Sequence, residues 1–195
     1  EPKNAQLNRF YTREFYQIVA GKLLPGGVFS FGLTGAETSL SPLRAAYLAM
    51  AYHTLGQVFP EVAAFPGGRV RFFASTGGGV LVSDPEVLVR RLKERQIALQ
   101  YVREYYLLQD LSPWRRQYLD QVLRQPRPEV NTDLNPRCYF FDLALSTVQE
   151  GLGVKDALLA VQNLPPAVPW VALALATVLA GAALRRRPGL RSLYQ

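Results

Sequence analysis

Apolar residues between positions 10 and 23 recur at the spacing of an α-helix. Phe15, Val19 and Leu23 lie four positions apart, so one face of this helix would be apolar and buried. Pro25-Gly26-Gly27 then ends the helix, because proline cannot continue it and glycine tolerates a positive φ. Residues 28–31 are a short, mostly apolar run, which is typical of a strand buried on both faces. The pattern therefore predicts a helix, a tight turn and a buried strand.

A second helix and two further strands follow. Ser41-Pro42 is a helix-start signal, with serine as the N-cap and proline in the first turn, and Pro60 ends the apolar helical face that follows. Residues 61–65 and 70–74 predict two strands joined by Pro66-Gly67-Gly68. Because this connection is too short for a parallel crossover, the two strands must form an antiparallel hairpin.

These elements together predict the fold class α/β, with a mixed sheet flanked by helices. A helix, a turn and a buried strand make half of a βαβ unit, in which another strand precedes the helix. Only about ten residues precede the helix in this sequence. We therefore expect the chain to be the C-terminal part of a longer protein.

The segment 163–184 has a different pattern, because none of its residues is charged and three arginines, 185–187, follow it. Its length matches the roughly 20 residues of a transmembrane helix, and Trp170 near one end suits the membrane interface. A buried core helix is the alternative. The positive-inside rule puts the arginines in the cytoplasm, so that a single span would leave the globular part outside.

The chain accordingly divides into four parts. Residues 1–127 form the α/β part. Pro126 and Pro128 mark a linker, and the second part, 128–162, combines this linker with amphipathic helices suited to a membrane surface. Residues 163–184 are the predicted transmembrane helix, and residues 185–195 are a basic tail.

Charge and cysteine content remove several classes of function. Four arginines after residue 184 supply +4 of the formal net charge of +7, so residues 1–184 carry only +3. No basic face interleaved with aromatic residues is visible, which argues against a nucleic-acid partner. Cys138 is the only cysteine, so an intrachain disulfide framework and a multi-cysteine zinc site are excluded, and we expect no metal site.

Few residues suggest chemistry on their own. His53 is the only histidine, and Cys138 lies among apolar residues, so both are predicted to be structural. In an open α/β sheet, ligands bind beyond the carboxyl ends of the strands. The loop that contains Glu37 lies at such an end, with Tyr11 as a neighbour. Glu1 and Glu37 are candidate carboxylates near the ends of elements, so the candidate substrate-binding residues are Glu1, Tyr11 and Glu37.

Three blocks of sequence resemble the spermidine synthase-like proteins, especially their integral-membrane members. Glu1-Pro2 resembles the tail of an acidic motif, in which Glu1 takes the second acidic position. The run from Tyr11 to Tyr16, YTREFY, and then Pro25-Gly26-Gly27 match the blocks that follow in that family. The stretches 58–60, 74–75 and 131–136 are weaker matches, so the resemblance covers roughly residues 1–140.

The resemblance implies the C-terminal half of a Rossmann-like, methyltransferase-type mixed sheet that ends in an antiparallel hairpin. It also implies transfer of an aminopropyl group from decarboxylated S-adenosylmethionine to a diamine such as putrescine. Glu1 would help to hold the amine and Tyr11 would line the pocket. Because a sulfonium is a good leaving group, the protein mainly orients the reactants and stabilises charge. The family further implies a lipid bilayer as a partner, with the protein in the bacterial inner membrane and its catalytic domain in the cytoplasm.

The sequence departs from this family in three places. The first catalytic acid and the glycine-rich cofactor motif would precede Glu1, so we expect the missing N-terminal half to be needed and this part alone to be inactive. Gly32 stands where the family often has glutamine, and the loop 34–37 reads TGAE rather than the usual Ser-Pro type. The alternative function is therefore a non-catalytic, membrane-tethered interaction module with the same fold. A third interpretation is a small membrane-surface binding protein that is complete as given.

Overall fold

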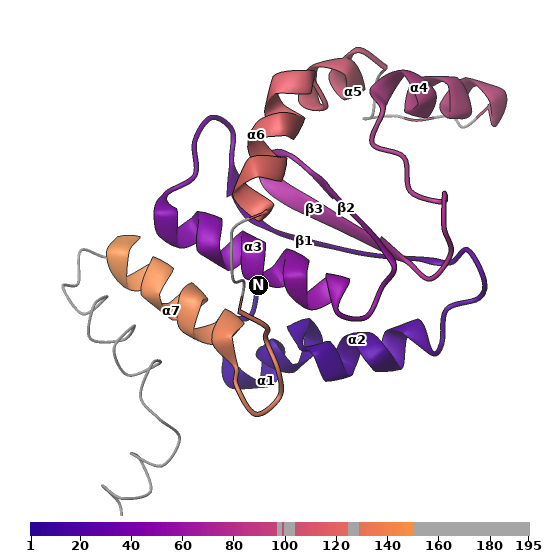
Figure 1. Ribbon diagram of the computed structural model, residues 1–195. Coiled ribbons are helices and arrows are strands. Elements are labelled where there is room, and N and C mark those ends of the chain that lie inside the picture. Colours follow the sequence, from indigo (N-terminus) through magenta and orange to yellow (C-terminus); the bar gives the residue numbers. More distant parts are fainter. Residues whose placement is uncertain (97–98, 100–103, 125–128, 150–195) are drawn as a thin grey trace, which may run out of the picture. The chain divides into compact units, whose positions relative to one another are not determined.

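The computed structural model of the chain describes residues 1–96, 99, 104–124 and 129–149. The predicted span 163–184, the tail 185–195 and parts of the predicted region 128–162 lie outside these residues. The elements, in chain order, are α1 (Ala5–Asn8), a 3₁₀ turn η1 (Arg9–Tyr11), α2 (Arg13–Ala20), β1 (Val28–Ala36), α3 (Pro42–Gly56), β2 (Glu61–Phe65), β3 (Gly67–Ser75), α4 (Pro85–Glu94), α5 (Glu104–Asp110), α6 (Pro113–Leu123) and α7 (Arg137–Gln149) (Figure 1).

Polar side chains cap the N-termini of four helices, α1 to α4, as the sequence predicts for α3. The Ser41 hydroxyl accepts the N–H of Arg44 in the first turn of α3, and Pro42 occupies the first position of that turn. Asp84 caps α4 in the same way, and Thr12 caps α2. These caps satisfy backbone donors that an unfinished helix end would leave unpaired.

The sheet has three strands in the order β1-β3-β2, and both pairs are antiparallel. Strands β2 and β3 form the predicted hairpin, with Val62 opposite Ala74. The other edge of β3 pairs with β1, from Val28 opposite Ser75 to Ala36 opposite Gly67. As a result β1 and β2 run in the same direction but are separated by β3.

The prediction of a mixed sheet, which the resemblance extended to half of a Rossmann-like sheet, was therefore wrong. The sheet of the described residues is small, and each pair of neighbouring strands in it is antiparallel. The short connection at residue 66 turns the chain back, and β3 enters the space between β1 and β2. The backbone N–H and C=O groups along the two edges of β3 then form hydrogen bonds with both neighbouring strands. Only the hairpin of that prediction is confirmed.

No helix in the described part of the chain combines the length and the hydrophobicity that crossing a lipid bilayer requires. The transmembrane helix predicted at 163–184 falls outside that part, so this half of the predicted fold class gains no support from the structure.

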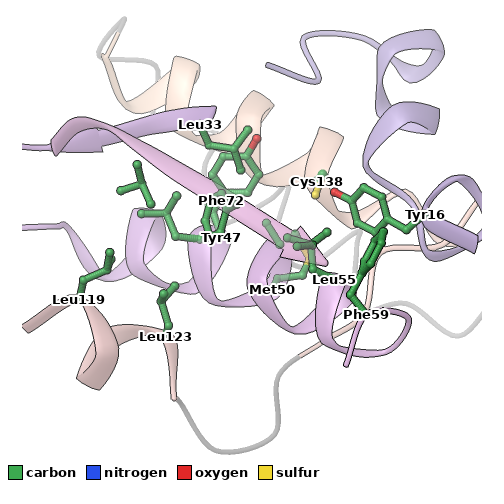
Figure 2. Close-up of a cluster of buried hydrophobic side chains, with 14 of the residues drawn as sticks. Tyr16, Leu33, Tyr47, Met50, Leu55, Phe59, Phe72, Leu119, Leu123 and Cys138 are labelled. Carbon is green, nitrogen blue, oxygen red and sulfur yellow. The ribbon is translucent and has the colours of Figure 1, made fainter. Parts of the chain in front are cut away.

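One face of the sheet is packed against α3. The rings of Phe31 and Phe72 stack on this face with their centroids 5.2 Å apart, and Leu33 beside them is fully buried. Side chains from four helices complete this packed cluster: Tyr16 from α2, Tyr47, Leu48, Met50 and Leu55 from α3, Leu119 and Leu123 from α6, and Cys138 from α7 (Figure 2). The packed face is thus the hydrophobic core of the described residues.

The opposite face of the sheet is covered only in part. Because side chains alternate along a strand, the residues next to the core positions point to this second face. Its polar end carries Thr34 and Arg69, which lie opposite each other. Its apolar end carries Phe65 and Phe73, and residues 80–82 and α4 cover this end. The two ends offer two different surfaces for binding.

Candidate functional site

Glu1 and Tyr11, two of the three predicted site residues, lie together near the end of β1. One carboxylate oxygen of Glu1 accepts hydrogen bonds from the backbone N–H and the hydroxyl of Thr34, at 2.6 and 2.7 Å. The amino group of Glu1 donates to the Tyr11 hydroxyl at 3.0 Å. The Tyr11 ring stands edge-on to Phe31, at 5.4 Å between centroids. This contact anchors Tyr11 to the rim of the core.

Asn131 holds Tyr11 in place through the backbone. Its side-chain amide donates to the Tyr11 carbonyl at 2.9 Å and accepts the N–H of Cys138 at 3.1 Å. Its own N–H donates to the Thr54 hydroxyl on α3 at 3.0 Å. Because Asn131 is fully buried, these bonds are shielded from water. This residue joins the segment before α2 to α3 and α7, a role that the sequence did not reveal.

Asp142 on α7 is a second carboxylate close enough to interact with Glu1. Burial and then the negative charge of Glu1 raise the pKa of Asp142, while the cationic groups of the N-terminus, Lys3 and Arg44 act in the opposite direction. The pKa of Tyr11 is also raised, first by burial and then by Glu1, so its phenol stays protonated at neutral pH. Two carboxylates and a neutral phenol hydroxyl therefore share this region.

Tyr47 adds a buried hydroxyl to the same neighbourhood. Its side chain is fully buried, and its oxygen has no hydrogen-bond partner among the described residues. Burial raises its pKa well above the usual value, and the charges of Glu1 and Asp142 add to the effect. Glu1, Tyr11, Asp142 and Tyr47 form what we call the carboxylate–phenol cluster.

Two arginines border this cluster, and each is bound to a backbone carbonyl of β1. Arg44 donates to the Thr34 carbonyl at 3.1 Å, and Arg69 donates to the Gly32 carbonyl at 2.6 Å. A Cβ atom at position 32 would lie 2.6 Å from Nε of Arg69. Glycine at this position therefore makes room for an arginine where the resembling family often has glutamine.

Glu37, the third predicted site residue, has different partners from Glu1 and Tyr11. One of its carboxylate oxygens accepts the N–H of Gly68 at 2.6 Å, and the other pairs with Arg115 of α6 at 2.7 Å. These two partners lower its pKa. Glu37 therefore joins the hairpin turn to α6, a contact that we call the Glu37 clamp.

Neither His53 nor Cys138 has the surroundings of a reactive group. Nε2 of His53 is buried without a hydrogen-bond partner among the described residues. Cys138 is fully buried, and burial, Asp142 and Glu1 all raise its pKa, so it remains a thiol rather than a nucleophilic thiolate. Within the described ranges, no group of three or more His, Cys, Asp or Glu side chains is arranged to hold a metal ion.

Comparison of this sequence with protein-family models and with curated proteins found no match. The resemblance to spermidine synthase-like proteins therefore remains an expectation.

The cavities do not suit the sulfonium co-substrate that the resemblance implies. A cavity of ≈ 530 Å³ has Arg91 and Arg95 as its charged lining residues, and one of ≈ 430 Å³ on α6 has two arginines, Arg116 and Arg124, against one carboxylate, Asp120. Guanidinium groups would repel the cationic sulfonium of decarboxylated S-adenosylmethionine. We therefore derive no step through this co-substrate from the described residues.

Proposed function

We propose that this chain supplies the amine-binding part of an aminopropyltransferase that uses a diamine such as putrescine as the acceptor. The resemblance assigns amine binding to Glu1 and pocket lining to Tyr11, and it places the motif for decarboxylated S-adenosylmethionine before residue 1. The carboxylate–phenol cluster would hold the ammonium groups of the diamine.

The observation that carries this proposal is the Glu1 carboxylate, which Thr34 holds beside the Tyr11 hydroxyl and whose charge, after burial, raises the pKa of Asp142. The negative charge of Glu1 contributes to the raised pKa of Asp142, and a cation beside the two carboxylates would relieve this repulsion. An ammonium group donates hydrogen bonds, and carboxylate and phenol oxygens accept them. Thr34 fixes one oxygen of Glu1 and leaves the other without a partner among the described residues.

A protonated amine must also lose a proton before its nitrogen can act as a nucleophile. A carboxylate with a raised pKa is a stronger base than an ordinary one, and Asp142 is the member of the cluster with this property. In this proposal Glu1 and Tyr11 orient the amine, and Asp142 is the candidate proton acceptor.

Calorimetric titration of putrescine into the 195-residue chain tests amine binding. We expect Glu1→Gln and Asp142→Asn each to weaken binding about tenfold, since each variant loses a charge-assisted contact. Glu86→Gln is the matched control, because Glu86 is an exposed carboxylate at the start of α4. Butane-1,4-diol, which has the same length without charge, should not bind.

The affinity should also depend on pH in a defined direction. Protonation of Asp142 removes the charge that attracts the amine, so binding should weaken as the pH falls through its raised pKa. In Asp142→Asn this part of the pH dependence should disappear. Equal affinities for the wild type and both site variants would contradict the amine-binding site and would favour a non-catalytic interaction module.

Group transfer needs a separate assay on a longer chain that includes the upstream sequence. Decarboxylated S-adenosylmethionine should bind to that longer chain and not to these 195 residues. If neither binds the co-substrate, the aminopropyltransferase part of the proposal is wrong, even where amine binding is found.

A further inference from the structure

The apolar end of the second sheet face forms the floor of a cavity of ≈ 530 Å³. Phe65 and Phe73, whose ring centroids are 4.9 Å apart, lie on this floor beside Ala63. Leu88 and Leu92 of α4 face them from the other side. This volume is within the range of small-molecule sites, roughly 300–1,000 Å³.

Two arginines are the charged residues in the lining of this cavity: Arg91 lies on α4, and Arg95 is the residue that follows its last position, Glu94. Arg91 and Arg95 are four positions apart, so they share one face of the helix. Arg91 donates to the Val80 carbonyl at 3.4 Å, and Arg95 has no side-chain partner in the described part of the chain. Neither has a carboxylate partner there.

The neighbouring cations on and near this helix are different. Arg90 pairs with Glu94 at 3.9 Å, and Lys93 pairs with Glu104 at 3.1 Å. Among the four cations of residues 90–95, the two that lack an acidic partner in the described part of the chain are therefore the two that line the cavity. An anionic group that enters the cavity would find two guanidinium groups that form no ion pair with a carboxylate of the described residues.

We propose that this cavity binds a single-chain fatty-acid carboxylate, with the alkyl chain on the Phe65–Phe73 floor and the carboxylate at Arg91 and Arg95. The apolar lining matches an alkyl chain, and guanidinium groups bind carboxylates through paired, charge-assisted hydrogen bonds. A cationic amphiphile would be repelled by the same two arginines. This site is separate from the carboxylate–phenol cluster and does not depend on the proposed amine binding.

Calorimetric titration of saturated fatty acids into the 195-residue chain, below their micelle concentrations, tests the proposal. We expect decanoate to bind, and affinity to rise about fourfold for each added CH₂ until the cavity is full. Decanol and decylamine have the same chain without a negative charge, and they should bind at least tenfold more weakly.

Three variants locate the site. Arg91→Gln and Arg95→Gln should each weaken decanoate binding about tenfold, whereas Arg90→Gln, which removes a cation paired with Glu94, should leave it unchanged. Ala63→Leu places extra volume on the floor and should reduce the longest chain that binds. Thermal unfolding of each variant shows whether it is folded, and Glu1→Gln should bind decanoate like the wild type.

Several results would overturn the proposal. Equal binding of decanol and decanoate would remove the role of the arginines, and an equal loss in Arg90→Gln and Arg91→Gln would show a non-specific charge effect. If decanoate does not bind and sedimentation shows that the chain self-associates, a second copy occupies this surface instead. Each of these outcomes leaves the test of putrescine binding unaffected.

Discussion

The two faces of the sheet are formed by the same three strands but are covered in different ways. On the packed face, Leu33, Phe72 and Ala74 are fully buried under α3. On the second face, Phe65 and Phe73 remain partly exposed above a cavity. Alternating side chains thus contribute to a close-packed interior on one face and to a binding surface on the other.

The difference separates stability from function. A filled interior loses contacts whenever an atom is removed, because the surrounding side chains relax only in part. An open apolar surface loses less, because water or a ligand can take the place of the missing atoms. The packed face should therefore dominate the free energy of unfolding, and the second face should dominate the binding of apolar ligands.

Neighbouring phenylalanines on β3 provide the strongest test of this difference. Phe72→Ala removes a fully buried ring from the packed face and should lower the free energy of unfolding by about 3–5 kcal/mol. Phe73→Ala removes a partly exposed ring from the second face and should cost about 1 kcal/mol. Urea unfolding followed by circular dichroism gives both values.

The same pair of variants also separates binding from stability. Phe73→Ala should weaken decanoate binding although it remains folded. Similar stability costs for the two variants would mean that the second face is packed as closely as the first, and the comparison of the two faces would be wrong.

The sequence was sufficient for the elements whose signals are local. The Ser41-Pro42 start of α3 and the hairpin at residues 61–75 depend on capping and on a short connection, both of which can be identified from neighbouring residues. The position of β3 between β1 and β2 could not be identified in this way, because it depends on which strand pairs with β1, and this contact joins residues far apart in the sequence. The assumption of a parallel neighbour for β1 led to the wrong sheet.

The candidate site was predictable in the same limited sense. Glu1 and Tyr11 were selected because they lie near the ends of predicted elements and in two blocks that resemble a known family. Asp142 and Asn131 were missed as site residues, because more than a hundred positions separate them from Tyr11 and only the packing of α7 brings them near. Glu37 was selected for its place after a strand, but its two oxygens are engaged by Gly68 and Arg115.

Replacing Asn131 tests whether the stability of the packed face depends on a buried polar contact as well as on apolar packing. Asn131→Ala would leave the Tyr11 carbonyl and the Cys138 N–H without their partner and should cost about 2–3 kcal/mol. Asn135→Ala is the matched control, since Asn135 is exposed and bonds through its backbone, so its cost should stay within about 0.5 kcal/mol. Chemical denaturation measures both. A cost for Asn131→Ala as small as that of the control would show that apolar packing alone holds α7 and Tyr11 in place.

Replacing Glu37, which joins the hairpin turn to α6, should have the smallest effect on the free energy of unfolding. Its side chain is 68% exposed, so the pairing with Arg115 is screened by water and Glu37→Gln should cost less than about 1 kcal/mol. The two partners lower the pKa of Glu37. Its contribution to the free energy of unfolding is therefore fully present when the pH is above the ordinary pKa of about 4.5, and it is lost as the pH falls through the lowered pKa. Thermal unfolding from about pH 7 to pH 3 should therefore show the wild type and Glu37→Gln converging in acid.

A double-mutant cycle with Arg115→Gln separates the ion pair from the bond to Gly68. If the carboxylate acts mainly through Arg115, Glu37→Gln should cost little once Arg115 is replaced. If the cost persists in the double variant, the Gly68 N–H is the main partner, and Glu37 stabilises the hairpin turn rather than its contact with α6. A difference between wild type and Glu37→Gln that does not change with pH would contradict both forms of the clamp.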